Sequence, residues 1–145
     1  CDYIGNITDL TQFANDSIDA IYASHVLEHV DQNAALPALV GIYRVLKKGG
    51  LFYVSVPDMD ILAHTLINPL LSIEDKFLVM RMMFGGQIDA HDYHYFGWTQ
   101  MFLFNYLRRA DFSNGERVAS FGLFEDTSES KPFGFPISLN VIATK

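Results

Sequence analysis

The sequence has few of the features that tie a chain to an oxidising compartment or to a membrane. Cysteine occurs only once, as Cys1, so no disulfide can form within the chain. No apolar run reaches the ~18–20 residues that span a bilayer, and no basic start is followed by an apolar stretch and a small-residue cleavage site. These absences favour a reducing environment, and we predict a cytoplasmic protein with no membrane partner.

Positive charge is also scarce. Lysine and arginine together number 10 against 17 aspartates and glutamates, which gives a formal net charge of -7. The basic residues gather only in two short groups, Arg44-Lys47-Lys48 and Arg108-Arg109. Proteins that bind nucleic acids usually concentrate positive charge on one face to neutralise phosphates. The composition therefore predicts no nucleic-acid partner.

The hydrophobic content is high enough for one well-packed domain. Half of the 145 residues are hydrophobic and 14% are aromatic, and no repeat or low-complexity tract interrupts the chain. This length matches the common size of a single domain. We predict one domain over residues 1–145.

Alternating strand and helix patterns predict an α/β fold. Short apolar runs bounded by turn residues predict the strands, and apolar residues at helical spacing predict the helices. In chain order, the expected elements are a strand at Cys1–Gly5, a strand at Ile18–Ala23, a helix at Ala34–Lys47, a strand at Leu51–Val56, helices at Met59–Ile67, Ser72–Phe84 and Thr99–Ala110, and strands at Arg117–Leu123 and Ser138–Thr144. This order predicts a mostly parallel sheet with helices on both faces and an antiparallel C-terminal strand.

Two features punctuate this pattern. Gly49-Gly50 is expected to stop the helix that ends at Lys47. The region at about 59–97 is expected to be a helical insertion that ends in a polar, aromatic loop over Gln87–Gly97. Its second helix opens with a start that resembles a capping box, at Ser72. One face of that helix carries four apolar residues, Ile73, Phe77, Met80 and Phe84.

Two sequence phrases resemble motifs of the class I S-adenosylmethionine-dependent methyltransferases. The run from Ser17 to His29 (SIDAIYASHVLEH) is similar to the fourth-strand motif of that family, in which an acidic residue opens the strand and a small residue ends it beside the cofactor. The run from Tyr43 to Phe52 (YRVLKKGGLF) is similar to the turn into the fifth strand, usually R-x-L-K-P-G-G, with Lys48 in place of proline. The two phrases follow one another in the order of the family.

The rest of the chain extends the resemblance. Its C-terminal order of helix, strand, loop and strand is similar to the antiparallel ending of these enzymes. The run MMFGGQID, followed by His91 and His94, resembles a subgroup of predicted methyltransferases. The resemblance implies a three-layer Rossmann-like sheet. It also implies an enzyme that uses S-adenosylmethionine and yields S-adenosylhomocysteine. It also implies methyl transfer to an oxygen or nitrogen of a small-molecule acceptor.

The resemblance also implies where the ligands lie. In open α/β sheets the ligand binds outside the carboxyl ends of the strands. Ser24 and His25, and with them Asn6 and Ile7 at the position that meets adenine in the family, are expected to contact the cofactor. The residues expected to contact the acceptor are Pro57, Asp58 and Gln87.

The glycine-rich cofactor loop of the family has no counterpart in these residues. The glycine pairs at 49–50 and 85–86 do not fit G-x-G-x-x-G. The resemblance therefore implies that the first strands of the sheet are missing. We expect these residues alone to be weakly active or inactive, and either a longer gene product or a second copy, in a homodimer, to cover the incomplete sheet.

The histidines offer the acid–base chemistry of the predicted site. His91 and His94 lie in a polar cluster with Asp89 and Asp92, and either histidine can deprotonate an acceptor hydroxyl. His29 is the third candidate. The alternative interpretation is a solvated loop that is held in place by its aromatic residues.

Two rival functions remain open. HVLEH, from His25 to His29, also fits the H-x-x-E-H pattern of a zinc hydrolase, with Glu28 as base and both histidines as ligands on one helical face. No third ligand is evident from the sequence, so we assign no metal. The other rival is a non-catalytic methyltransferase-like module that forms dimers.

Overall fold

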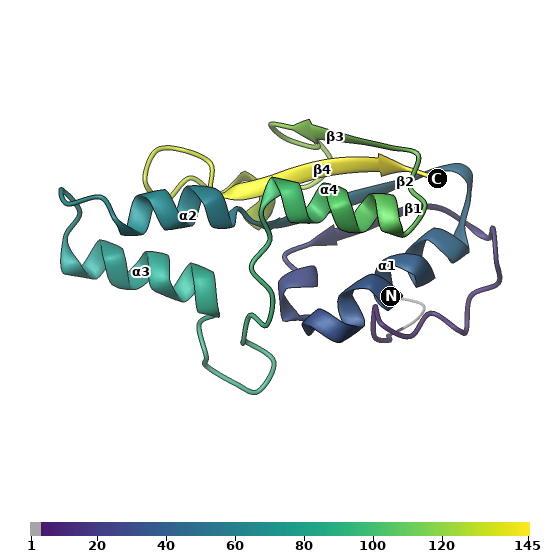
Figure 1. Ribbon diagram of the computed structural model, residues 1–145, viewed down its shortest axis with the longest axis horizontal. Coiled ribbons are helices and arrows are strands. Elements are labelled where there is room, and N and C mark those ends of the chain that lie inside the picture. The colour runs from purple at the N-terminus through teal and green to yellow at the C-terminus, as the bar shows by residue number, and fades with distance from the viewer. Residues whose placement is uncertain (1–3) are drawn as a thin grey trace.

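The computed structural model describes residues 4–145 as a mixed sheet with four helices of eight or more residues (Figure 1). The strands are β1 (Ile18–Ser24), β2 (Leu46–Pro57), β3 (Asn114–Val118) and β4 (Ser138–Thr144). The α-helices are α1 (Gln32–Val45), α2 (Met59–Leu66), α3 (Ile73–Phe84) and α4 (Gln100–Arg109), and the two 3-10 turns are η1 (Leu27–His29) and η2 (Thr127–Glu129). The strand expected at Cys1–Gly5 falls largely on residues 1–3, outside the described part.

The sheet has the strand order β1-β2-β4-β3. β1 and β2 are parallel, whereas β4 is antiparallel to both of its neighbours, β2 and β3. Three strands therefore run in one direction and the C-terminal strand runs against them, as the sequence predicts. The α/β fold class is confirmed. β1 forms one edge of the sheet, and no strand of residues 4–145 pairs with its outer side.

The passage from α1 into β2 differs from the expected one. The helix ends at Val45 instead of Lys47, and Lys47 to Gly50 form an irregularity in β2 between the residues that pair with Ile18 and Ala20. Gly50 is required there, because a Cβ would lie 2.8 Å from the carbonyl oxygen of Lys47. The glycine pair thus permits a close turn at the start of the strand and does not cap the helix.

The main core lies between the sheet and the helices α1 and α4. Asp31 caps α1, since its carboxylate accepts hydrogen bonds from the backbone N–H groups of Asn33 and Ala34. The buried residues of α1 pack against Phe52, Val54 and other apolar residues of the strands. They are Ala35, Ala38, Leu39, Ile42 and Val45.

The other face of the sheet is covered by an irregular segment. The strand expected at Arg117–Leu123 begins earlier, at Asn114, and ends at Val118. The chain then leaves the sheet, and the ring of Phe121 packs edge-on against the rings of Tyr22 and Tyr53. These aromatic contacts explain the early end of β3, because Phe121 covers the sheet face instead of extending an edge.

Helices α2 and α3 form a pair at the end of the molecule away from α1 (Figure 1). The cap at Ser72 is confirmed, since its hydroxyl accepts a hydrogen bond from the backbone N–H of Asp75. Leu62 of α2, Val79 of α3 and Ile137 form a small second core. The apolar face expected on α3 is exposed: it consists of Ile73, Phe77, Met80 and Phe84.

The described helices are all too short or too polar to cross a bilayer.

Candidate functional site

The carboxyl ends of β1 and β2 meet at one edge of the sheet. Ser24 ends β1, and it lies opposite Ser55 near the end of β2. The backbone N–H of His25 donates to the carbonyl oxygen of Ser55 at 2.9 Å, which carries the pairing one residue beyond β1. The predicted site residues Ser24, His25 and Pro57 are therefore neighbours at this edge.

His25 has a specified orientation. Its φ is 53°, in the left-handed region, so the chain turns sharply after β1. The hydroxyl of Ser138 donates to the carbonyl oxygen of Thr127, which leaves it to accept from Nε2–H of His25 at 2.9 Å. Nδ1 of His25 then lies 3.3 Å from Oε1 of Glu28, and it donates to that oxygen only when the ring is protonated.

Glu28 is a buried acid at the centre of this region. Its side chain is 1% exposed, and neither carboxylate oxygen accepts a hydrogen bond from residues 4–145. Its backbone carbonyl oxygen accepts from the N–H groups of Tyr95 and Phe96, at 2.8 and 3.3 Å. Glu28 therefore anchors the loop at residues 87–97 to the end of β1.

This anchoring brings His94 against His29. The two rings contact edge to face, with centroids 4.8 Å apart. Nδ1 of His29 lies 3.0 Å from the carbonyl oxygen of Tyr93, and the backbone N–H of His94 donates to the carbonyl oxygen of Phe84. Two of the histidines predicted as catalytic thus form one cluster, although they come from distant parts of the chain.

The surroundings of His94 favour its neutral form. Burial lowers the pKa of its imidazole below the ordinary value of 6.5, and the nearby imidazoles of His29 and His25 lower it further. The carboxylate of Glu28 and a hydrogen bond with the Met82 backbone oppose this effect but do not cancel it. A neutral imidazole keeps one nitrogen lone pair free for a proton or a metal ion.

A cavity of about 250 Å³ adjoins the cluster. His25 and His94 lie on its wall, as does Pro57. The remaining lining residues come from the end of α3 and from the segment before β4: Arg81, Met82, Gly86, Thr127, Ser130 and Ile137. The cavity lies outside the carboxyl ends of parallel strands, where ligands of α/β folds bind.

Three other predicted residues lie apart from this cavity. Asp58 is buried, and its carboxylate caps α2 and forms an ion pair with Arg117 at 2.7 Å. Gln87 and His91 are exposed on the loop, and the backbone N–H of His91 donates to the Asp89 carboxylate. Of the three predicted catalytic histidines, only His29 and His94 belong to the cluster.

Asn6 and Ile7 are also apart from Ser24 and His25. The Asn6 side chain is exposed and accepts hydrogen bonds from Thr8. Ile7 lies in an apolar hollow with Ile18 and Ile21, in the first half of β1. The structure therefore places these two residues nearer the amino end of β1.

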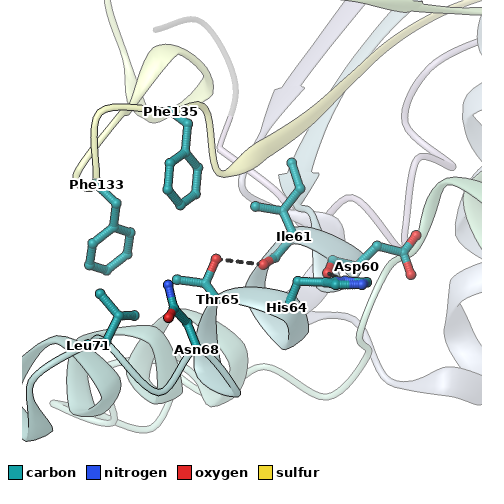
Figure 2. A pocket seen from close by; sticks show the side chains of 8 residues that line it. All are labelled: Asp60, Ile61, His64, Thr65, Asn68, Leu71, Phe133 and Phe135. Carbon is teal, nitrogen blue, oxygen red and sulfur yellow. Dashed lines mark hydrogen bonds between the residues drawn. The ribbon is translucent and has the colours of Figure 1, made fainter.

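A larger hollow, of about 670 Å³, lies beside α2 (Figure 2). Figure 2 shows the rings of Phe133 and Phe135 facing α2 from the segment that precedes β4. Its histidine, His64, has Nδ1 2.8 Å from the carbonyl oxygen of Asp60. The predicted site residues do not line this hollow, and among the described residues His64 is its single histidine.

The H-x-x-E-H motif does not have the geometry of a zinc hydrolase. That mechanism needs both histidines on one face of an α-helix, but η1 is a single 3-10 turn over Leu27–His29 and His25 precedes it with a positive φ. Instead, Glu28, His29 and His94 place one potential ligand atom each within 4.8 Å of one another. The third potential ligand, His94, lies outside the H-x-x-E-H motif and comes from the loop, so the spacing of the motif does not reveal it.

Comparisons with known proteins agree with this fold. Residues 2–54 match the family model described as a methyltransferase domain, a span that includes β1, α1 and most of β2. No curated protein matches the chain in sequence.

Several solved methyltransferase structures resemble the chain. A possible histamine N-methyltransferase from Thermotoga maritima is 20% identical, with a TM-score of 0.58, over 97% of this chain and 62% of that one. An S-adenosylmethionine-dependent methyltransferase from Archaeoglobus fulgidus is 14% identical, with a TM-score of 0.61, over 97% of this chain and 66% of that one. The 1,6-didemethyltoxoflavin-N1-methyltransferase from Burkholderia thailandensis was solved with 1,6-didemethyltoxoflavin and S-adenosylhomocysteine. It is 18% identical, with a TM-score of 0.56, over 96% of this chain and 48% of that one.

The resemblance to methyltransferases is thus confirmed in the sequence of residues 2–54, and the Rossmann-like fold is similar to that of solved S-adenosylmethionine-dependent methyltransferases. The chain spans less than two thirds of the length of each of these three structures. At these sequence identities the likeness establishes the fold, and function has to be argued from the site.

Proposed function

We propose that this chain is part of an S-adenosylmethionine-dependent methyltransferase that methylates an oxygen or nitrogen atom of a small acceptor. The observation that carries the proposal is the cavity at the carboxyl ends of β1 and β2, with His25, Pro57 and His94 on its wall. It lies beside the segment that matches the methyltransferase family model. Its volume of about 250 Å³ is below the ~300–1,000 Å³ usual for whole ligand pockets, which suits a small acceptor.

The described residues fit only one side of a cofactor site. No strand of the described residues pairs with the outer side of β1, and this leaves its carboxyl end open on the side away from β2, so Ser24 and His25 are the residues that we propose to adjoin the cofactor. Asn6 and Ile7 remain candidates on sequence resemblance alone. The chain contains no G-x-G-x-x-G segment, and we propose that residues 1–145 alone bind the cofactor weakly and have little activity.

The residues around the cavity have separate proposed roles. When bound, the cofactor supplies an electrophilic methyl group, so the protein mainly has to align the acceptor and exclude water. Pro57 lines the acceptor side, whereas Asp58 and Gln87 do not line the cavity and remain candidates on sequence resemblance alone. His94 and His29 are the proposed groups that receive the acceptor's proton when it is a hydroxyl. His91 is a weaker candidate because it is exposed outside the cavity.

Calorimetric titration with S-adenosylhomocysteine tests the proposal. We expect the natural gene product that carries these residues to bind it, and the isolated 145 residues to bind it at least tenfold more weakly. A His25→Ala variant of the gene product should weaken binding, whereas His64→Ala, a histidine beside α2, should not. If the gene product shows no binding, the methyltransferase proposal is wrong.

A second candidate function, a non-catalytic module that forms dimers, has one specific observation in its favour. The exposed apolar face of α3 has no partner within residues 4–145. A homodimer through this face would be detected by sedimentation at micromolar concentration. A stable dimer without cofactor affinity would favour this function over catalysis.

A further inference from the structure

We propose that Glu28, His29 and His94 form a binding site for one divalent first-row transition-metal ion. One carboxylate oxygen and one nitrogen from each imidazole lie within 4.8 Å of one another. Ligand atoms lie about 2.0–2.2 Å from such an ion, so in a tetrahedral site they lie about 3.4 Å from one another. The three ligand atoms therefore need to approach one another by up to about 1.4 Å to bind an ion.

The carboxylate of Glu28 is an independent sign that a cation binds here. It is 1% exposed, and neither oxygen accepts a hydrogen bond from residues 4–145. A buried carboxylate without donors is strongly unfavourable, and proteins usually pair such a group with a cation or a metal ion. Nδ1 of His25 lies 3.3 Å from one oxygen, and within the described residues the other oxygen has no partner.

The imidazole of His29 is oriented as a metal ligand usually is. The backbone carbonyl oxygen of Tyr93 only accepts hydrogen bonds, so Nδ1 of His29, 3.0 Å away, has to carry the hydrogen. The lone pair of His29 is then on Nε2. Histidine ligands commonly donate their second N–H to a backbone carbonyl in this way, which fixes the ring and its tautomer.

The backbone holds the third ligand in place before any ion binds. The N–H groups of Tyr95 and Phe96 donate to the carbonyl oxygen of Glu28, and that of His94 donates to Phe84. The residue that supplies the carboxylate therefore also anchors the loop that supplies His94. Such rigid support is what a metal site needs, because ligand positions have to be held within a fraction of an ångström.

The ligand set determines the class of ion and its use. Two imidazoles and one carboxylate favour zinc, manganese, iron or cobalt over calcium and magnesium, which prefer oxygen ligands. Three protein ligands leave coordination positions open, and His94 lies on the wall of the cavity. This use rests on the proposed function and changes the role of the two histidines there: with an ion bound, His29 and His94 would act as ligands. An acceptor hydroxyl at an open position would then release its proton to solvent more readily, because a metal ion lowers the pKa of a bound hydroxyl.

Metal titration of the untagged natural gene product tests the site. We expect one Zn²⁺ per chain by calorimetry, and a Co²⁺ complex whose visible absorption bands report the imidazole and carboxylate ligands. Glu28→Gln, His29→Ala and His94→Ala should each weaken Zn²⁺ binding more than the ~10–100-fold that loss of an outer hydrogen-bond partner causes. His64→Ala, a histidine outside the cluster, should bind Zn²⁺ as the unchanged protein does.

Glu28→Gln also separates a metal site from a structural contact. The amide has the size of the carboxylate and no charge, so we expect the metal-free variant to unfold at the same or a higher temperature. Zn²⁺ should raise the unfolding temperature of the unchanged protein but not that of the variant.

The metal site and the methyltransferase proposal can fail separately. Absence of saturable Zn²⁺ or Co²⁺ binding would overturn the metal site, as would equal binding by all three cluster variants. S-adenosylhomocysteine binding by the same protein would then leave the methyltransferase proposal intact. Metal binding without S-adenosylhomocysteine binding would support the metal site and overturn the methyltransferase proposal.

Discussion

Helices α1 and α3 have similar lengths and apolar stripes, but they lie in very different surroundings. α1 buries five apolar residues against the sheet, whereas α3 buries only Val79 and leaves five large apolar residues exposed. Both helices have a side-chain cap at the N-terminus, from Asp31 and Ser72. The difference therefore lies in what each apolar face meets, and local helix signals do not reveal it.

The contrast extends to the regions around the two helices. The sheet with α1 and α4 contains the main core, and the pair formed by α2 and α3 has only a small one. The site lies where the two regions join, because Glu28 lies just beyond the end of β1 and the loop after α3 supplies His94. Substitutions in the main core, in the α2–α3 pair and at their junction test whether the two regions differ in this way.

The largest effect is expected in the main core. Leu39→Ala removes a fully buried side chain of α1 and should lower the free energy of unfolding by about 3 kcal/mol. The exposed neighbour Val40 provides the control, because Val40→Ala should change it by less than about 0.5 kcal/mol. Urea unfolding followed by circular dichroism measures both. Equal effects would mean that α1 is not packed on the sheet as described.

Breaking the connection between the two regions should have the next largest effect. Arg117 of β3 pairs with the buried carboxylate that caps α2, so Arg117→Ala leaves Asp58 without its cation. Because Arg117 is partly exposed, we expect this variant to lower the free energy of unfolding by about 2 kcal/mol. That is below the ~3–5 kcal/mol lost when a fully buried pair is broken. Hydrogen exchange should show the loss first in α2 and α3. Arg108→Ala, at an exposed position of α4, is the control.

A smaller effect is expected where α3 turns into the loop that bears His94. Gly85 has φ of 86°, and a Cβ there would lie 2.2 Å from the carbonyl oxygen of Asp92. Gly85→Ala should destabilise the fold by about 1–2 kcal/mol and weaken Zn²⁺ binding, because the loop has to move.

Gly122→Ala isolates the conformational part of that effect. Gly122 also has a positive φ, but no atom lies within 4 Å of the position that a Cβ would take there. This variant should show the conformational strain of about 1 kcal/mol without any change in Zn²⁺ binding. Equal loss of Zn²⁺ binding in both variants would contradict the role of the loop.

The smallest change in stability is expected on the exposed face of α3. Phe77→Gln and Phe84→Gln together should alter the free energy of unfolding by about 0.5 kcal/mol or less, because neither ring is buried. Val79→Ala on the buried face of the same helix should be clearly more destabilising. If the double variant unfolds much more easily, the face is covered in solution, and sedimentation would show whether a second copy covers it.

The sequence predicted those parts of the fold that depend on local patterns. The parallel strands, the four helices, the cap at Ser72 and the antiparallel last strand are all present. The errors arose where distant contacts decide the outcome. β3 ends at Val118 because Phe121 packs against two tyrosine rings, and α1 ends at Val45 because Leu46 already pairs with Ile18 of β1.

The same distinction between local patterns and distant contacts applies to the candidate site. Placement of Ser24, His25 and Pro57 at one sheet edge follows from the rule for parallel strands. The meeting of Glu28 with His94 depends on backbone hydrogen bonds from the loop, which leave no periodic signal in the sequence. The sequence indicates Glu28 only as the base of an H-x-x-E-H motif, since nothing local shows that its carboxylate is buried without donors.

The position of β4 has a consequence for the order of folding. β4 follows every other strand along the chain, yet it lies between β2 and β3 in the sheet. Neither β2 nor β3 can pair with β4 during synthesis until β4 has left the ribosome, so the edge of β2 that β4 covers has no partner strand before then. Unpaired strand edges promote aggregation, which rapid pairing with β4 prevents.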